Sequence, residues 1–185
     1  MFANFNKQKQ FKGYNDYPVE YKFLGFGEDV SYNTMSEMKR IIKESSKNWI
    51  VIQTARNIVQ NENPKDRIGE VTAIYNWVRN KTRYIMDPAG TEHLQTPLVA
   101  IDMIRQGQVF QGDCDDLTIL VLSLLKAIGY NVKMIAAAYS PKKNLTHIYG
   151  AVYLINKWVI VEPIKLNVPL GWEAPNKTRK VEMII

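Results

Sequence analysis

The residue best suited to covalent chemistry is Cys114, the only cysteine in a chain of 185 residues. It follows Gly112, which allows the backbone to turn, and Asp113, which is a typical N-cap residue. Apolar residues at helical spacing run from Leu117 to Ile128, and Gly129 comes at the position where glycine ends helices. The pattern is apolar on all sides, so it predicts a buried helix with the thiol at its first residue.

A thiol at a helix N-terminus can act as a nucleophile, because the backbone N–H groups there favour the thiolate. The neighbouring carboxylates of Asp115 and Asp116 act in the opposite direction. A lone cysteine is also commonly a buried, inert residue. Both interpretations of Cys114 follow from this stretch alone.

A cysteine nucleophile needs a base and a group that orients the base, and only two histidines are available. His147 begins one predicted strand and Glu162 ends the next, with a hairpin turn at either Ile155-Asn156 or Asn156-Lys157. Both registers place Glu162 on the same face as His147, and the first, which we prefer, makes them diagonal neighbours. The hairpin is equally compatible with a non-catalytic His147 in a half-buried strand and a surface Glu162 that does not interact with it.

The remaining polar residues give weaker indications. His93 lies in a polar loop and is predicted to be an ordinary surface histidine. Asp113, Asp115 and Asp116 resemble a cation loop only superficially, since an EF-hand spreads its ligands over twelve residues. The sequence therefore predicts no metal site and no cofactor.

The elements that must position these side chains fall into two groups. Helical periodicity extends from Ser31 or Asn33 to about Asn61, with Trp49 on one apolar face, and returns from Asp66 to about Thr82 and after Pro97. Strands are predicted over three later segments, namely Val132–Tyr139, His147–Leu154 and Trp158–Glu162. Helices followed by strands indicate an α+β fold, with a helical N-terminal part packed on an antiparallel sheet.

Three segments make up the predicted organisation of the chain. Residues 1–30 are aromatic and polar without periodicity and are expected to form an extended arm. Residues 31–165 form the folded domain, and residues 166–185, punctuated by proline and glycine, are expected to be an irregular tail.

Composition excludes several classes of protein. A hydrophobic content of 46% is sufficient for a core, and a single cysteine excludes an intrachain disulfide framework. The net charge of +6 comes from scattered lysines and arginines, so nucleic-acid binding is not expected. No apolar run reaches the length of a membrane span and the start lacks the apolar core of a secretory signal, which predicts a cytoplasmic protein.

Taken in order, these residues resemble the transglutaminase-like superfamily, most closely its short, calcium-independent branch in bacteria and their phages. The resemblance covers about residues 34–164, and the family's acid also lies fifteen positions after its histidine. The matching pieces are Tyr75-Asn76-Trp77-Val78-Arg79, Tyr84, Asp87-Pro88, Gln95-Thr96-Pro97, Gly112-Asp113-Cys114-Asp115-Asp116, His147 and Trp158-Val159-Ile160-Val161-Glu162-Pro163.

The resemblance implies a papain-like core in which Cys114 is the nucleophile, His147 the base and Glu162 the orienting acid. The family usually has aspartate where this chain has Glu162. The oxyanion donor is open: the Cys114 backbone N–H is one candidate and Gln108, six residues earlier, is another, with Gln111 and Trp77 as competitors.

The expected activity is therefore cysteine-dependent acyl transfer or hydrolysis of amide bonds in a protein or peptide substrate, through a thioester. Protease, amidase and transglutaminase chemistry all remain open. The alternative is a non-catalytic structural or assembly component on the same fold, such as a phage virion protein, whose terminal arms contact other subunits. In either case we expect the protein in a bacterial or phage-infected cell, and under the alternative also in a virion.

Overall fold

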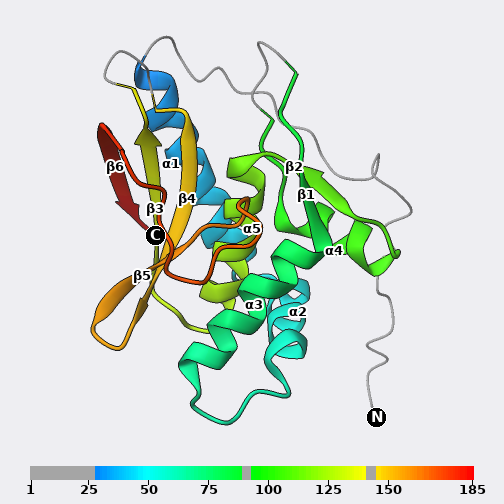
Figure 1. Ribbon diagram of the computed structural model, residues 1–185. Helices are drawn as coiled ribbons and strands as arrows, with labels where there is room; N and C mark the ends of the chain where they lie inside the picture. The colour runs from blue at the N-terminus through cyan, green and yellow to red at the C-terminus, as the bar shows by residue number, and fades with distance from the viewer. Residues whose placement is uncertain (1–27, 89–92, 141–144) are drawn as a thin grey trace, which may run out of the picture.

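The computed structural model describes residues 28–88, 93–140 and 145–185. Five helices and six strands follow one another along this part of the chain (Figure 1). The expected α+β fold is confirmed. The arm expected over residues 1–30 lies almost entirely outside the described residues, so its structure stays a prediction.

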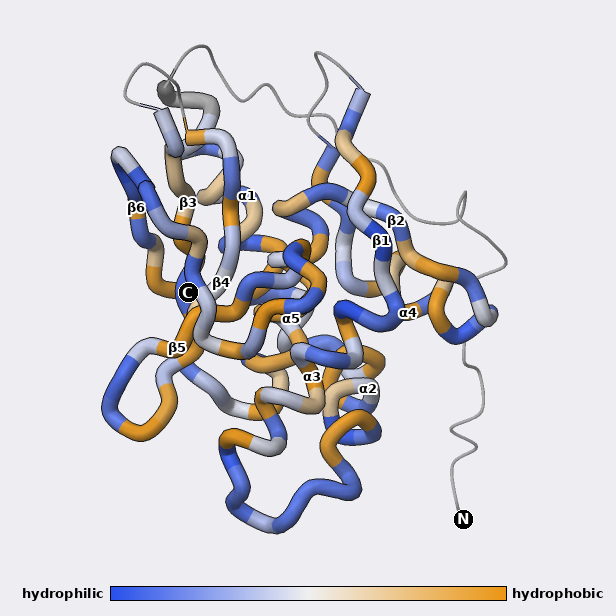
Figure 2. Tube along the Cα trace, in the orientation of Figure 1, coloured by the Kyte–Doolittle hydropathy of each residue, from blue (hydrophilic) through white to orange (hydrophobic). Residues whose placement is uncertain are grey.

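Three helices come first, and local capping explains where they begin. They are α1 (Glu28–Ser45), α2 (Trp49–Val59) and α3 (Arg67–Lys81). The Asn48 side chain accepts from the Ile50 N–H at the start of α2, and Asp66 accepts from Gly69 at the start of α3. The loop between α2 and α3 is hydrophilic (Figure 2). Trp49, predicted on an apolar face, is 62% exposed, because the first residue of α2 projects beyond the core.

Helix α5 (Cys114–Ala127) is the centre of the molecule and contacts α1, α2, α3 and the sheet (Figure 1). Every residue from Asp115 to Leu125 is buried, which confirms the helix predicted from its all-round apolar pattern. Gly129 follows the helix with φ +96°, a conformation that glycine adopts without a steric penalty.

A short helix and a two-stranded ribbon lead the chain into α5. Helix α4 (Pro97–Arg105) is followed by β2 (Phe110–Gly112), which pairs in parallel with β1 (Thr82–Tyr84). The sequence patterns did not predict this pairing of β1 with the residues before Cys114.

The main sheet has four antiparallel strands in the order β5-β4-β3-β6. They are β3 (Val132–Ala138), β4 (His147–Leu154), β5 (Lys157–Val161) and β6 (Arg179–Ile184). One face packs on the helices, and Gly150 is essential there because a Cβ atom would lie 2.6 Å from Leu122 Cδ2 of α5. The other face carries a smaller apolar cluster of Ile135, Ala137, Tyr149 and Ala151, with Trp158 and Ile160 packed against it.

The C-terminal segment corrects the prediction of a tail that is irregular throughout residues 166–185. Residues 179–184 form β6 and pair with β3. Residues 164–178, called the strap below, connect three elements: the Val168 carbonyl accepts from Arg79 of α3, the Gly171 N–H donates to Ile160 of β5, and the Thr178 N–H donates to Ala138 of β3. The irregular part therefore ends at residue 178, because long-range pairing orders the residues beyond it.

Candidate active site

Cys114 is the first residue of α5 and is partly exposed. Its position is set by Asp113, the N-cap residue, whose carboxylate accepts from the Asp115 N–H at 3.1 Å. Cys114 thus lies at the positive end of the helix dipole, the position predicted from the sequence.

His147 and Glu162 form a direct pair, with His147 Nε2 2.7 Å from Glu162 Oε2. The Glu162 side chain is 2% exposed and that of His147 is 13% exposed. The second oxygen of Glu162 accepts from the Ile164 N–H at 3.2 Å. Because a carboxylate accepts hydrogen bonds and cannot donate them, Nε2 carries the proton and Nδ1 is the basic nitrogen of the neutral ring.

The β4–β5 hairpin explains how these two side chains meet. The ladder pairs Gly150 with Val161, and its continuation sets Tyr149 opposite Glu162, which is the preferred register. The turn consists of Ile155 at φ +46° and Asn156 at φ +64°, the left-handed conformations of a type I′ turn. Ile155 adopts this unfavourable conformation because the register of the two flanking strands leaves it no other position.

Helix α5 and strand β4 bring Cys114 and His147 to the same end of the fold. Thr118 Oγ1 donates to the Ile148 carbonyl at 3.3 Å, and Leu122 lies against Gly150 further along. Helix and strand therefore run alongside in the same direction (Figure 1). Cys114 lies one helical turn before Thr118, and His147 directly precedes Ile148 in the chain.

The negative charge of Glu162 also acts on one residue of the helical layer. The phenol of Tyr75, on α3, has a raised pKa, mainly from burial and in part from the negative charge of nearby Glu162. Tyr75 thus lies near enough for the charge of Glu162 to act on it, and the strap continues from Glu162.

Tyr84 is a neighbour of Cys114 to which sequence reasoning assigned no role. The parallel ribbon pairs Tyr84 with Gly112, and the Ile85 N–H donates to the Gly112 carbonyl at 2.9 Å. The pKa of the Tyr84 phenol is raised, first by burial and then by the negative charges of Cys114 and Asp113. The sequence contained one signal for it, since Tyr84 is part of the family resemblance.

The three side-chain candidates for the oxyanion donor lie on the loop after α4, on β2 and on α3. Gln108 is exposed, and its backbone N–H donates to the Met103 carbonyl at the end of α4. Gln111 is exposed on β2, and Trp77 is partly buried on α3. The assignment of Gln108 stays a prediction.

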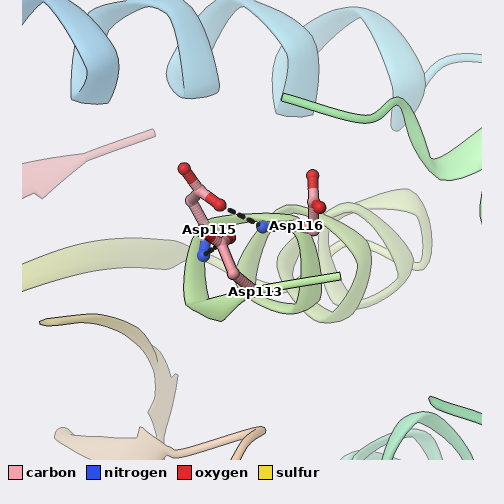
Figure 3. A group of neighbouring side chains, drawn as sticks. All are labelled: Asp113, Asp115 and Asp116. Atoms are coloured by element: carbon pink, nitrogen blue, oxygen red, sulfur yellow. Dashed lines mark hydrogen bonds between the residues drawn. The ribbon is translucent and has the colours of Figure 1, made fainter. Parts of the chain in front are cut away.

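Three carboxylates surround the start of α5 (Figure 3). Ligand oxygens of Asp113, Asp115 and Asp116 lie within 4.8 Å of one another, and among the described residues this is the group close enough to share a cation. All three carboxylates already accept backbone N–H groups: Asp113 accepts from Asp115, Asp115 from Asp116, and Asp116 from Gln95. The cluster therefore has an evident structural role at the beginning of the helix.

Asp116 is held by Gln95, a second residue that sequence reasoning did not assign. Its carboxylate accepts from the Gln95 N–H at 2.6 Å and from the Gln95 side-chain amide at 2.9 Å. The pKa of Asp116 is nevertheless raised to about 7, mainly by burial and in part by the charges of Asp113 and Asp87, against the effect of the Gln95 hydrogen bonds. Gly112 allows this approach, because a Cβ atom there would lie 2.6 Å from an Asp116 oxygen.

His93 is exposed, and its backbone N–H donates to Asp87 at 2.6 Å. The structure thus places His93 in a surface loop, beside Asp87. We do not include His93 in the candidate site.

Comparison of the sequence with family models identifies the fold. Residues 52–163 match the model of the transglutaminase-like superfamily, and this stretch contains Cys114, His147 and Glu162. The chain belongs to the transglutaminase-like superfamily. The recognition made from the ordered motifs is thereby confirmed at the level of the superfamily.

Solved structures with a similar fold come from bacteria. One is a candidate cysteine protease from Cytophaga hutchinsonii, 19% identical, with a TM-score of 0.51 over 80% of this chain and 51% of that one. Another is a candidate protease from Parabacteroides distasonis, 11% identical, with a TM-score of 0.51 over 78% of this chain and 31% of that one. This transglutaminase-like chain thus spans about half of the first protein and a third of the second.

No curated protein matches the sequence significantly. Among the helices of the described ranges, none combines the length and the apolar composition needed to cross a bilayer.

Proposed function

We propose that this transglutaminase-like protein is a cysteine-dependent hydrolase of amide bonds in proteins or peptides, with Cys114, His147 and Glu162 as its catalytic residues. The observation that carries the proposal is the 2.7 Å contact between His147 and the buried Glu162 at the end of the fold where α5 presents Cys114. Two solved structures with this fold are described as candidate proteases, which supports the same class of reaction.

In the proposed mechanism each of these side chains takes part in a defined step. His147 Nδ1 takes the proton of the Cys114 thiol, and the thiolate attacks the carbonyl carbon of the substrate to form a C–S bond. Glu162 holds the ring through Nε2 and stabilises the imidazolium that results. As the tetrahedral intermediate collapses, the C–N bond breaks and the imidazolium gives its proton to the leaving amine.

The thioester is then resolved by water, which His147 deprotonates so that a carboxylic acid leaves and the thiol is restored. An amine in place of water would give transfer instead of hydrolysis. The backbone N–H of Cys114 at the helix start is suited to stabilise the oxyanion, and Gln108 is the side-chain donor that we propose to test beside it.

The assembly role stays the second candidate, but its support is narrower than the sequence suggested. It rested on two terminal arms, and residues 179–184 of the second arm belong to the sheet as β6. A bacterial or phage origin, a cytoplasmic location and incorporation in a virion remain proposals that derive from the family resemblance alone.

Alkylation of Cys114 with iodoacetamide tests the proposal, and the label is unambiguous because the chain has one cysteine. A free thiol has a pKa of about 8.5, so at about pH 5.5 only roughly one molecule in a thousand is a thiolate. The denatured chain provides this reference. We expect the folded protein to react at about pH 5.5 up to a thousandfold faster than the reference and to lose this advantage in His147→Gln.

A folded protein whose alkylation follows the same pH dependence as the denatured chain would contradict the enzyme proposal and favour the assembly role. If the low-pH reactivity is present, incubation with a peptide mixture in ¹⁸O water containing a primary amine identifies the second step. Hydrolysis incorporates ¹⁸O into new carboxylates, whereas transfer incorporates the amine.

A further inference from the structure

Tyr149 stacks on the face of the His147 ring, in addition to the contact that Glu162 makes at its edge, and the strap in turn contacts Tyr149. Tyr149 lies two residues after His147 on the same face of β4, and the ring centroids are 5.4 Å apart with an interplanar angle of 26°. Tyr149 is 1% exposed, so this stacked arrangement is fixed by packing on all sides. The imidazole thus has a buried aromatic ring against one of its faces.

The strap supplies a charged partner for that tyrosine. Tyr149 Oη donates to Glu173 Oε1 at 2.6 Å, and the other oxygen of Glu173 lies 3.2 Å from Lys177 Nζ. Although burial alone would raise the pKa of Glu173, the hydrogen bonds from Tyr149 and Lys177 outweigh it and lower the pKa. Glu173 is therefore a carboxylate at neutral pH, and the phenol keeps its proton, because burial and the bond to Glu173 raise the pKa of Tyr149.

The strap that carries Glu173 is anchored on both sides of it. Before it, the Gly171 N–H donates to the Ile160 carbonyl of β5 at 2.9 Å. After it, the Thr178 N–H donates to the Ala138 carbonyl of β3 at 2.9 Å, and Lys177 Nζ donates to the Ala174 carbonyl at 2.6 Å. A carboxylate held in this way has a fixed position relative to the sheet, which a free tail could not provide.

We propose that Glu173 and Tyr149 are positioning residues that hold the His147 ring and favour its protonated form. A phenol that donates a hydrogen bond to a carboxylate has a more electron-rich ring, and the face of such a ring attracts a cation. The imidazolium exists only after His147 has taken the thiol proton, so the interaction stabilises the charged state that the reaction creates. This inference rests on the proposed function for its catalytic consequence but not for its effect on His147.

Other charged and titratable groups near the pair must be considered in any test by pH. Glu162 lies at the edge of the imidazole, Tyr139 at the end of β3 has its ring centroid 6.4 Å from that of His147, and Tyr75 of α3 lies near Glu162. On the side of Glu173, Lys177 and Lys180 are the nearby cations. None of these groups is altered by the two central substitutions below.

The test measures the titration of His147 by the ¹⁵N resonances of its imidazole, in a Cys114→Ser, His93→Gln background so that neither the thiol nor the second histidine contributes. Glu173→Gln preserves an acceptor for the tyrosine and removes only the charge, and Tyr149→Phe preserves the stacked ring and removes only the hydroxyl. We expect each to lower the titration midpoint by roughly half a pH unit, the scale of a unit charge acting across one ring.

A third variant should shift the titration midpoint of His147 in the opposite direction, and it leaves the Tyr149–Glu173 hydrogen bond in place. Lys177→Gln removes the cation that neutralises Glu173, so the midpoint of His147 should rise. The double variant Glu173→Gln, Tyr149→Phe should lower the midpoint no more than either single change, because both act through one link. Matched controls on the same sheet are Glu182→Gln, which breaks an ion pair with Lys133, and Tyr153→Phe, and neither should shift the midpoint.

Unchanged midpoints in both Glu173→Gln and Lys177→Gln would overturn the inference. In the chain with Cys114 intact, Glu173→Gln and Tyr149→Phe should lower the upper pH limit of the Cys114 thiolate–His147 imidazolium pair by a similar amount, and Lys177→Gln should raise it. A chain that shows the predicted His147 shifts but no low-pH alkylation would refute the proposed enzyme while leaving the positioning of His147 established. A chain that shows low-pH alkylation but none of the predicted His147 shifts would refute the positioning role alone.

Discussion

Replacing Glu162 by glutamine should move the ring proton of His147 to Nδ1, the nitrogen that we propose as the base toward the Cys114 thiol, with little change in shape. The Ile164 N–H donates to Glu162 Oε1 at 3.2 Å, so the amide oxygen of the new side chain would keep that position. Its NH₂ group would then point at His147 Nε2, which now lies 2.7 Å from the other oxygen. Two donors cannot share one bond, so Nε2 must become the acceptor and the ring proton must move to Nδ1.

The expected loss of turnover follows from the loss of that tautomer of His147 and of the buried charge of Glu162. The same kind of change in a serine triad lowers turnover by about 10⁴, equivalent to about 5.4 kcal/mol of barrier. The thiol of the variant should ionise as an ordinary one, so its alkylation at about pH 5.5 should fall by roughly a thousandfold. Glu162→Asp retains the charge, and we expect it to keep more reactivity than Glu162→Gln.

The assay compares iodoacetamide labelling rates of Cys114 in wild type, Glu162→Gln and Glu162→Asp across pH, with urea unfolding as the control for folding. A Glu162→Gln protein that is folded and labels at the wild-type rate would show that Glu162 does not orient His147. A Glu162→Asp protein that loses reactivity while Glu162→Gln retains it would refute the triad in the same way.

Three further predictions concern stability and are measured by urea unfolding. The pKa of Asp116 is raised to about 7 in the folded protein, above its ordinary value of 3.8, so its contribution to stability is present below about pH 4 and is lost as the pH rises to 7. Asp116→Asn should remove this pH-dependent part of the free energy of unfolding, whose limiting slope is about 1.4 kcal/mol per pH unit. If the free energies of unfolding of the two proteins changed with pH in parallel, the raised pKa of Asp116 would be contradicted. Gly150→Ala should cost about 1–3 kcal/mol because of its contact with Leu122, and Leu122→Ala in the same chain should make the combined loss smaller than the sum. Ile155→Asn should stabilise the protein by about 1 kcal/mol, since asparagine tolerates φ +46° better than a β-branched residue, and an unchanged or lower stability would show that the turn is not strained.

Local patterns in the sequence determine where Cys114, His147 and Glu162 lie on their helix and strands. The apolar run after Asp113 specifies a buried helix with Cys114 at its start, because a helix surrounded by other elements must be apolar on every side. The two-residue period of strands likewise places His147 and Glu162 on one face whichever turn is used, and the length of the hairpin limits them to neighbouring positions. These conclusions need only contacts between residues close together in the chain.

Tertiary structure decides which segments distant in the chain come into contact. The sequence pattern of one segment does not indicate which other segment it will pack against. The pairing of β6 with β3, the contact of Gln95 with Asp116 and the bond between Tyr149 and Glu173 join residues separated by about 20 to 50 positions. Each has a local signature that also fits an exposed loop or tail, so periodicity could not distinguish the alternatives. Burial makes these contacts specific, because a polar group enclosed by the fold must find a partner there.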